Sequence, residues 1–183
     1  MVKPICSFFS KTNACKHGDD CIKSHSIRHT SPCIVLKSLY LFPDVDLKST
    51  LDNFEKILHT EIFFEDIFTE ISLGYGQISQ LFIAANSCRH IAGNVYIQFK
   101  DVECANNAIA GLSKRTYYYT EIKVERGAMI DISEAVCGDY LKGFCTKKGE
   151  CSYVHPINIS KRLLVDLYQS QYMLYSQTKK IRH

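Results

Sequence analysis

Eight cysteine and histidine residues near the two ends of the chain have the types and spacing of metal ligands. In the N-terminal set, with eight, five and three intervening residues, these are Cys6, Cys15, Cys21 and His25. In the C-terminal set, with seven, five and three intervening residues, they are Cys137, Cys145, Cys151 and His155. Three thiolates and one imidazole fill the tetrahedron that Zn²⁺ prefers in a structural site. The sequence therefore predicts two structural Zn²⁺ ions, each organising a small unit that we call finger one or finger two.

The remaining cysteines and the start of the chain indicate a reducing compartment. Met1-Val-Lys-Pro lacks the apolar stretch of a signal peptide, and six of the nine cysteines are assigned to metal. The other three, Cys33, Cys88 and Cys104, lie among apolar neighbours and are predicted to be buried thiols. No run of 18 apolar residues is present, so we expect no membrane span and a cytosolic or nuclear location.

The net charge of the chain does not indicate nucleic-acid binding, but the local cluster of basic residues in finger one does. The formal net charge is +3, and six thiolates with two Zn²⁺ ions change it by −2, to about +1. Finger one is locally basic and carries Phe8 and Phe9 shortly after its first ligand. Aromatic faces beside cations suit single-stranded RNA, so we interpret finger one as RNA-binding. The alternative is that Phe8 and Phe9 pack the finger against a neighbouring domain.

The middle of the chain alternates strand and helix patterns. Apolar residues, among them Phe54 and Leu58, recur near helical spacing between Asp44 and Ile71. The expected order is strand 33–41, helix 44–71, strand 78–85, strand 93–99, helix 102–112, a strand or hairpin at 117–124, and a closing helix at 160–175. This β-α-β-β-α-β order predicts an α+β ferredoxin-like sandwich of the RNA-recognition-motif (RRM) type.

The predicted sheet lacks most of the aromatic residues with which an RRM stacks bases. Tyr96 is retained, but Asn94 and Val35 occupy two of the usual aromatic places. We therefore expect this sheet to be a poor RNA surface and the domain to bind something else.

The order of finger, RRM-like domain and finger resembles the small-subunit family of U2AF, the splicing factor that recognises the AG at the 3′ splice site. The resemblance rests on CSFFSKTNACKHGDDC, FFEDIFTEIS, RHIAGNVYIQF and the second finger, and covers nearly the whole chain. It implies a U2AF homology motif, an RRM fold that binds a protein ligand, between two CCCH zinc fingers. The expected units are finger one (1–30), the RRM-like domain (31–127), finger two (128–158), and a C-terminal helix with a basic tail (159–183).

The resemblance also implies a partner site on the central domain. In this family an acidic helix and an Arg-X-Phe loop form a pocket for a tryptophan from a basic, proline-rich segment of the large U2AF subunit. The matching positions are Glu65, Asp66, Glu70, Arg115 and Tyr117. Where the family usually has Trp, this chain has a threonine at 116, so the contact is expected to be smaller or to be taken over in part by residues 117–119. The alternative is an acidic helix face that is only solvated.

Both fingers of this family contact RNA and lie side by side on the sheet. The positions that this implies as RNA contacts are Phe8, Lys16, His17, Lys23, Tyr140, Lys142 and Tyr153. Two departures, Ile22 for the usual Ser and Gly138 for the usual Arg, are expected to alter RNA contacts or sequence preference.

The prediction is a nuclear pre-mRNA splicing factor that is not an enzyme. It would bind single-stranded pre-mRNA at the 3′ splice site and the large U2AF subunit. No Gly-rich phosphate loop and no catalytic Ser/His/Asp set is visible in the sequence. Two alternatives stay open: a CCCH regulator of mRNA stability, and a protein-binding scaffold without RNA specificity.

Overall fold

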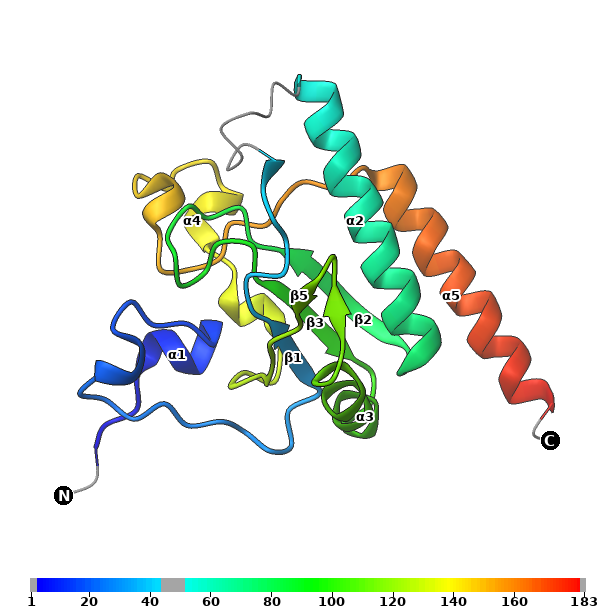
Figure 1. Cartoon of the computed structure of the whole chain (residues 1–183), viewed down its shortest axis with the longest axis horizontal. Coiled ribbons are helices and arrows are strands. Elements are labelled where there is room, and N and C mark those ends of the chain that lie inside the picture. Colours follow the sequence, from blue (N-terminus) through cyan, green and yellow to red (C-terminus); the bar gives the residue numbers. More distant parts are fainter. Residues whose placement is uncertain (1–2, 44–51, 182–183) are drawn as a thin grey trace.

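The structure is a computed structural model that describes residues 3–43 and 52–181, with the backbone alone for 178–181. Its centre is a four-stranded antiparallel sheet in the order β2-β3-β1-β6. The strands are β1 (Cys33–Leu36), β2 (Ile78–Ile83), β3 (Val95–Phe99) and β6 (Val124–Arg126). With helices α2 (Asn53–Gly74) and α3 (Val102–Leu112), the order is β-α-β-β-α-β, which confirms the predicted α+β, RRM-like fold (Figure 1).

Alternate residues of the sheet enter two separate cores on its two faces. On β1, Ile34 and Leu36 belong to the core that includes residues of α2 and α3. Cys33 and Val35 belong to a second core on the other face, as period-two alternation along a strand requires. That second core contains Ala14 of finger one and four residues of finger two, Met129, Ile132, Ala135 and Val154. The sheet is therefore buried between helices on one face and the fingers on the other.

Helix α2 begins with a capping box and continues beyond its predicted end. The Asp52 carboxylate accepts from the Glu55 amide, and the Glu55 carboxylate accepts from the Asp52 amide, both at 2.8 Å. The predicted first residues, 44–51, lie outside the described residues, and the helix runs three residues past Ile71. Phe54 and Leu58 are exposed because the first turns of α2 extend beyond the sheet (Figure 1).

The first strand ends at Leu36, five residues earlier than predicted, because the chain turns at Ser38. Ser38 has a left-handed φ of 47°, and its amide donates to the Asn94 side-chain oxygen at 2.8 Å. Tyr40 then donates its amide to the Gly93 carbonyl at 3.0 Å. Gly93 has a φ of 66°, and a β-carbon there would overlap the Tyr40 carbonyl oxygen. The turn thus needs glycine at position 93.

The predicted segment 117–124 forms a separate hairpin followed by the last strand. The hairpin consists of β4 (Thr116–Tyr117) and β5 (Thr120–Glu121), and it precedes β6. Of the three cysteines outside the ligand sets, Cys33 and Cys88 are buried as predicted, whereas Cys104 is only partly buried.

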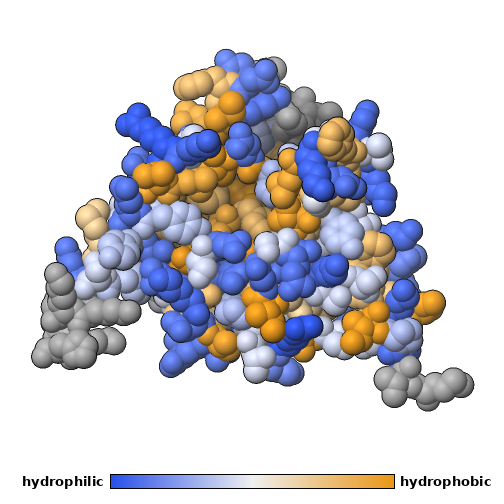
Figure 2. Space-filling model, turned by 180° about the vertical axis from the view of Figure 1, so that it is seen from behind, coloured by the Kyte–Doolittle hydropathy of each residue, from blue (hydrophilic) through white to orange (hydrophobic). Residues whose placement is uncertain are grey.

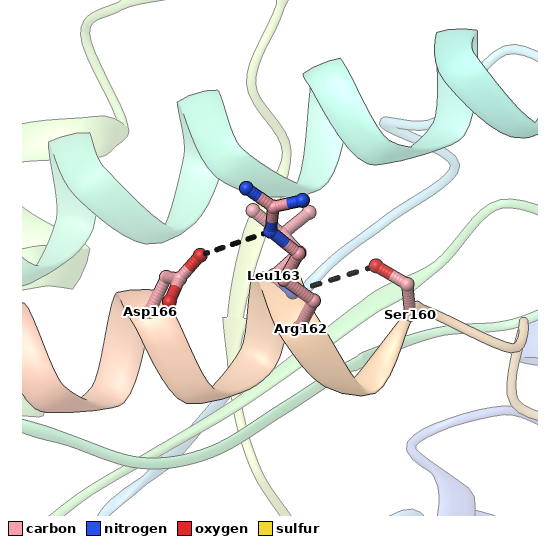
Figure 3. Close-up of polar contacts among 4 residues, drawn as sticks. All are labelled: Ser160, Arg162, Leu163 and Asp166. Carbon is pink, nitrogen blue, oxygen red and sulfur yellow. Dashed lines mark hydrogen bonds and ion pairs between the residues drawn. The ribbon is translucent and has the colours of Figure 1, made fainter.

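The C-terminal helix α5 (Lys161–Ile181) lies along α2 and continues past the predicted residue 175 (Figure 1). At its start, the Leu163 amide donates to the Ser160 hydroxyl at 3.4 Å, and Arg162 lies 3.9 Å from Asp166 (Figure 3). Gln171 accepts from the Ile78 amide at 2.8 Å and donates to its carbonyl at 2.9 Å. Helix α5 therefore supplies hydrogen bonds to the free edge of β2.

None of the helices in the described ranges is long and apolar enough to cross a bilayer. Seen from behind, the surface is largely hydrophilic, and hydrophobic residues gather in a hollow near the top of that view (Figure 2).

Candidate metal centres and the surfaces around them

The two predicted ligand sets each converge on one point. Within each set, the candidate ligand atoms all lie within 4.8 Å of one another. The two fingers are built alike, because the first cysteine precedes a short α-helix and the third follows a 3₁₀ turn. These elements are α1 (Ser7–Thr12) and η1 (Gly18–Asp20) in finger one, and α4 (Gly138–Leu141) and η4 (Lys148–Glu150) in finger two. Isolated parallel bridges, Ile5 with Ser24 and Val136 with Val154, close both loops in the same way.

The donor atoms fit a tetrahedral cation. The Nε2 atoms of His25 and His155 are buried and have no hydrogen-bond partner. The Cys137 and Cys151 sulfurs are 3.8 Å apart, and Zn–S bonds of about 2.3 Å in a tetrahedron separate sulfurs by about 3.8 Å. Burial raises the pKa of the Cys151 thiol to about 11 and lowers the pKa of His155, so the imidazole is neutral at pH 7. A bound cation would therefore hold Cys151 as the thiolate and use the lone pair of His155.

An aromatic ring stacks on the ligand histidine in each finger, three residues after the first cysteine. Phe9 stacks on His25 with ring centroids 4.3 Å apart, and Tyr140 stacks on His155 at 4.1 Å. Phe8, by contrast, is 38% exposed. Phe9 therefore packs within its own finger, which neither sequence interpretation anticipated, whereas Phe8 remains partly exposed. Tyr140, expected to contact RNA, has one ring face occupied by His155.

The two fingers meet at an aromatic and cationic contact. The rings of Phe8 and Tyr153 lie edge to face with centroids 6.0 Å apart, and Lys11 Nζ lies 5.9 Å from the Tyr153 centroid. Lys11 was not among the predicted contact residues, although its position three residues after Phe8 on α1 was a signal for it. The other predicted RNA contacts of basic type are all exposed: Lys16, His17, Lys23 and Lys142.

The sheet face that an RRM uses for RNA is buried in this chain. Tyr96 is fully buried, stacks with Phe82 at 5.1 Å, and donates its hydroxyl to the Thr12 carbonyl of finger one at 2.7 Å. Val35 is fully buried on the same face. The retained aromatic is therefore a packing residue beneath a finger, and the expectation of a poor RNA surface agrees with its burial.

Two buried asparagines that sequence reasoning missed attach the fingers to the sheet. Asn13 donates to the Arg126 carbonyl at 2.8 Å and accepts from the Ala128 amide. Its left-handed φ of 51°, which asparagine tolerates better than most residues, aims the side chain at this segment.

Asn86 attaches finger two in the same way. It donates to the carbonyls of Cys151 at 3.0 Å and Tyr153 at 2.9 Å, and it accepts from the His155 amide at 2.8 Å. The end of finger two also pairs antiparallel with the end of β2, because the Ala85 amide donates to the His155 carbonyl and the Ile157 amide donates to the Ile83 carbonyl.

Four of the five predicted partner-binding residues come together beside the β4–β5 hairpin. Arg115 forms an ion pair with Glu70, and the Tyr117 hydroxyl donates to Asp66 at 3.4 Å. Burial and the nearby Asp66 carboxylate raise the pKa of Tyr117 to about 12. Glu65 is exposed, and one residue along a helix places it about 100° around the axis from Asp66. The structure thus separates Glu65 from this group.

Tyr117 also lines an apolar cavity of about 470 Å³. Its ring packs edge to face on Phe63 with centroids 5.5 Å apart, and the Tyr40 hydroxyl lies 3.1 Å from His59 Nδ1. The lining residues are Leu39, Tyr40, Leu41, His59, Ile62, Phe63, Tyr117, Tyr118 and Thr120. Most of them come from the turn after β1 and from α2, which sequence reasoning did not connect with the hairpin.

Known proteins are similar to this chain over nearly its whole length. The family model "Zinc finger C-x8-C-x5-C-x3-H type (and similar)" matches residues 3–26. The Homo sapiens "Splicing factor U2AF 26 kDa subunit" is 34% identical over 172 residues, which are 91% of this chain and 78% of that protein. The Schizosaccharomyces pombe "Splicing factor U2AF 23 kDa subunit" is 34% identical over 175 residues, 92% of this chain and 78% of that protein.

Among solved structures, the RRM of RNA15 aligns with a TM-score of 0.35 and 19% identity, covering 57% of this chain and 98% of that one. A likeness of this size has no bearing on function.

Proposed function

Because the chain belongs to the family of U2AF small subunits, we propose that it is a nuclear pre-mRNA splicing factor subunit without catalytic activity. It binds single-stranded pre-mRNA at the AG of the 3′ splice site through its fingers. It binds the large U2AF subunit through its RRM-like domain. The units 1–30, 31–127, 128–158 and 159–183 divide these tasks, with the last helix supporting the central sheet.

Each finger holds one structural Zn²⁺ ion in this proposal. Four protein ligands fill the tetrahedron, so no coordination position is left for a substrate. The ion supplies the folding energy that loops of this size lack, and it fixes the aromatic residues that stack on the ligand histidines.

The contact between Phe8, Lys11 and Tyr153 carries the proposal of RNA binding. It joins the two fingers through the exposed Phe8 and Lys11 and the partly buried Tyr153, and aromatic and cationic groups suit the bases and phosphates of a single strand. A strand that crosses this contact would stack a base on Phe8 and reach basic residues of both fingers. Those residues are Lys16, His17 and Lys23 of finger one and Lys142 of finger two, with Tyr140 and Tyr153 as neighbours.

Substitution of Phe8 tests this contact. Phe8→Ala removes one stacking surface, and a lost base–aromatic stack weakens binding by about tenfold or more. Fluorescence anisotropy with a short RNA measures the change. Phe54→Ala, at a more exposed phenylalanine on α2 (71% against 38% for Phe8), is the control and should bind as the wild type does. Equal affinities of both variants would mean that RNA does not use the finger contact.

The acidic group and the apolar cavity support the proposal for the partner. Asp66 and Glu70 would attract a basic segment, and the cavity of about 470 Å³ beside Tyr117 is lined by the aromatic and aliphatic side chains that suit an indole. Glu65, which lies apart from this group, contributes only through its long-range charge.

Charge reversal tests the partner site with a control on the same helix. We expect Asp66→Lys with Glu70→Lys to weaken binding of a basic peptide with one tryptophan by at least about tenfold in titration calorimetry. Glu65→Lys with Glu61→Lys makes the same net change and should leave most of the affinity. If both pairs weaken binding equally, the acidic face acts only as a diffuse field.

A further inference from the structure

Finger two differs from finger one at two equivalent positions. Directly before the second cysteine ligand, finger one has Ala14, which is 3% exposed and belongs to the core on that face of the sheet. Finger two has Phe144 at this position, and Phe144 is 76% exposed. Three residues after the same ligand, finger one has Gly18 with a φ of 49°, whereas finger two has Lys148 with a φ of 48°. Finger two therefore carries two large side chains at places where finger one has small residues.

The end of α4 fixes the backbone of Phe144 but does not pack its ring. The Gly143 amide donates to the Tyr140 carbonyl at 3.0 Å, and the Phe144 amide donates to the Asp139 carbonyl at 2.8 Å. With a φ of 78° at Gly143, these bonds form a Schellman motif. An apolar residue in the place of Phe144 usually packs on the last turn of the helix, but the positions that would receive it are Gly138 and Asp139. The ring is therefore left open to solvent.

Lys148 adopts a backbone conformation that suits glycine. A residue with a side chain is strained in the left-handed region, because its β-carbon approaches a neighbouring carbonyl oxygen. Gly18 adopts the same conformation in finger one without this strain. Lys148 is exposed, so packing does not compensate for the strain. A strained, exposed lysine indicates a role outside folding.

Phe144 and Lys148 lie beside the same groove. Lys148 lines this groove, whose volume is about 390 Å³, and Phe144 lies at its rim, because both of its chain neighbours are lining residues. The Tyr140 ring, which stacks on His155, forms an aromatic wall. The lining residues are Ala85, Tyr140, Gly143, Cys145, Lys148, Gly149 and His155.

The charges around the groove favour an anionic ligand. Lys142, Lys147 and Lys148 are exposed, and none of them forms an ion pair with a residue in the described ranges. The two acidic residues between the first and third ligands are Asp139 and Glu150, and Glu150 accepts from the Ser87 hydroxyl at 3.1 Å. An exposed aromatic ring beside lysines suits a base and a phosphate of single-stranded RNA.

We propose that finger two binds one further nucleotide of the RNA, with its base stacked on Phe144 and its phosphate bound by Lys148. The inference rests on the proposed RNA-binding function and adds a second site to it. The groove is lined by residues other than Phe8, Lys11 and Tyr153, which form the contact between the fingers. The nucleotide at Phe144 therefore lies outside the AG, and it adds affinity without changing the preference for AG.

The length dependence of RNA binding tests Phe144. Fluorescence anisotropy compares UUAGGU with the same RNA extended by four uridines at each end. We expect the wild type to bind the longer RNA about tenfold more tightly, because one more base is stacked. Phe144→Ala should lose most of this gain while it keeps its affinity for UUAGGU and its preference over UUACGU. Phe54→Ala, at an exposed phenylalanine on α2, is the control and should keep the gain.

The salt dependence of binding tests Lys148. Lys148→Gly gives the turn the residue that finger one has there, so the variant should fold. For the longer RNA, the slope of log affinity against log salt concentration should become shallower by about 0.7, the value for one phosphate contact on a single strand. Lys147→Ala removes the same charge from a residue that does not line the groove, and it should change the slope by less than half as much.

The other outcomes overturn the inference in different ways. No gain with length in the wild type, or a full gain in Phe144→Ala, means that no base stacks on Phe144. Loss of the AG preference in this variant places Phe144 in the AG site itself. Equal changes of slope for the two lysine variants indicate a diffuse field of charge. Unchanged RNA binding with weaker binding of a basic tryptophan peptide assigns the ring to a protein. If the wild type binds neither RNA, the proposed RNA function fails, and the inference fails with it.

Discussion

Asn86 connects the central sheet to finger two, and its replacement should destabilise the protein strongly. The side chain is 1% exposed and makes three hydrogen bonds, to the backbone of Cys151, Tyr153 and His155. Asn86→Ala removes the printed partners of the Tyr153 carbonyl and the His155 amide, and it leaves the Cys151 carbonyl with only the Cys88 thiol as a donor, at 3.5 Å. At about 1 kcal/mol of net stabilisation for each bond, the expected loss is about 3 kcal/mol of unfolding free energy.

Urea denaturation of the zinc-loaded protein, followed by circular dichroism, measures this loss. Asn107→Ala, at an exposed asparagine of α3, is the matched control and should change stability by less than about 0.5 kcal/mol. Asn86→Asp tests the two donated hydrogen bonds separately from the accepted one, because a carboxylate can accept from the His155 amide but cannot donate to the two carbonyls. It should be at least as destabilising as alanine. A loss below about 1 kcal/mol for Asn86→Ala would refute the role assigned to this residue.

Three further substitutions should have effects that can be measured directly. Cys15→Ser should release the metal from finger one and abolish RNA binding, while the central domain still folds and binds peptide. A colorimetric chelator measures the released zinc and fluorescence anisotropy measures RNA binding, and full RNA affinity would contradict the expectation. Gly93→Ala should lower Tm by several degrees, because position 93 has a positive φ and an added β-carbon would overlap the Tyr40 carbonyl oxygen. Gly138→Ala should leave Tm nearly unchanged, because an added β-carbon there has no heavy atom within 4 Å, and equal Tm values for the two variants would contradict the role of Gly93. Gln171→Ala should speed hydrogen exchange at the Ile78 amide; unchanged protection would mean that α5 does not support the edge of β2.

The metal clusters and the order of the elements were predictable from the sequence because both depend on local spacing. A gap of three residues between Cys21 and His25, or between Cys151 and His155, fixes the ligand positions almost without regard to the rest of the chain. The strand ends were less predictable. The apolar run after Leu36 continues in sequence, but Ser38 adopts a left-handed conformation that only its partner Asn94, 56 residues away, makes evident.

Residues that connect distant segments were missed for the same reason. Asn86 resembles an ordinary loop asparagine until finger two is placed beside it, and Tyr96 resembles a stacking platform until finger one covers it. Among the acidic residues of α2, helical geometry separates Glu65 from Asp66 and Glu70, but the sequence does not show which side faces the hairpin. Tertiary contacts decide these roles.

We propose that the two metal-organised fingers together read an AG in single-stranded RNA. Fluorescence anisotropy of the full chain with the RNAs UUAGGU and UUACGU, with and without a zinc chelator, measures this preference. We predict a preference for UUAGGU of about tenfold or more, lost when the metal is removed. Equal binding of the two RNAs by the zinc-loaded protein would contradict it.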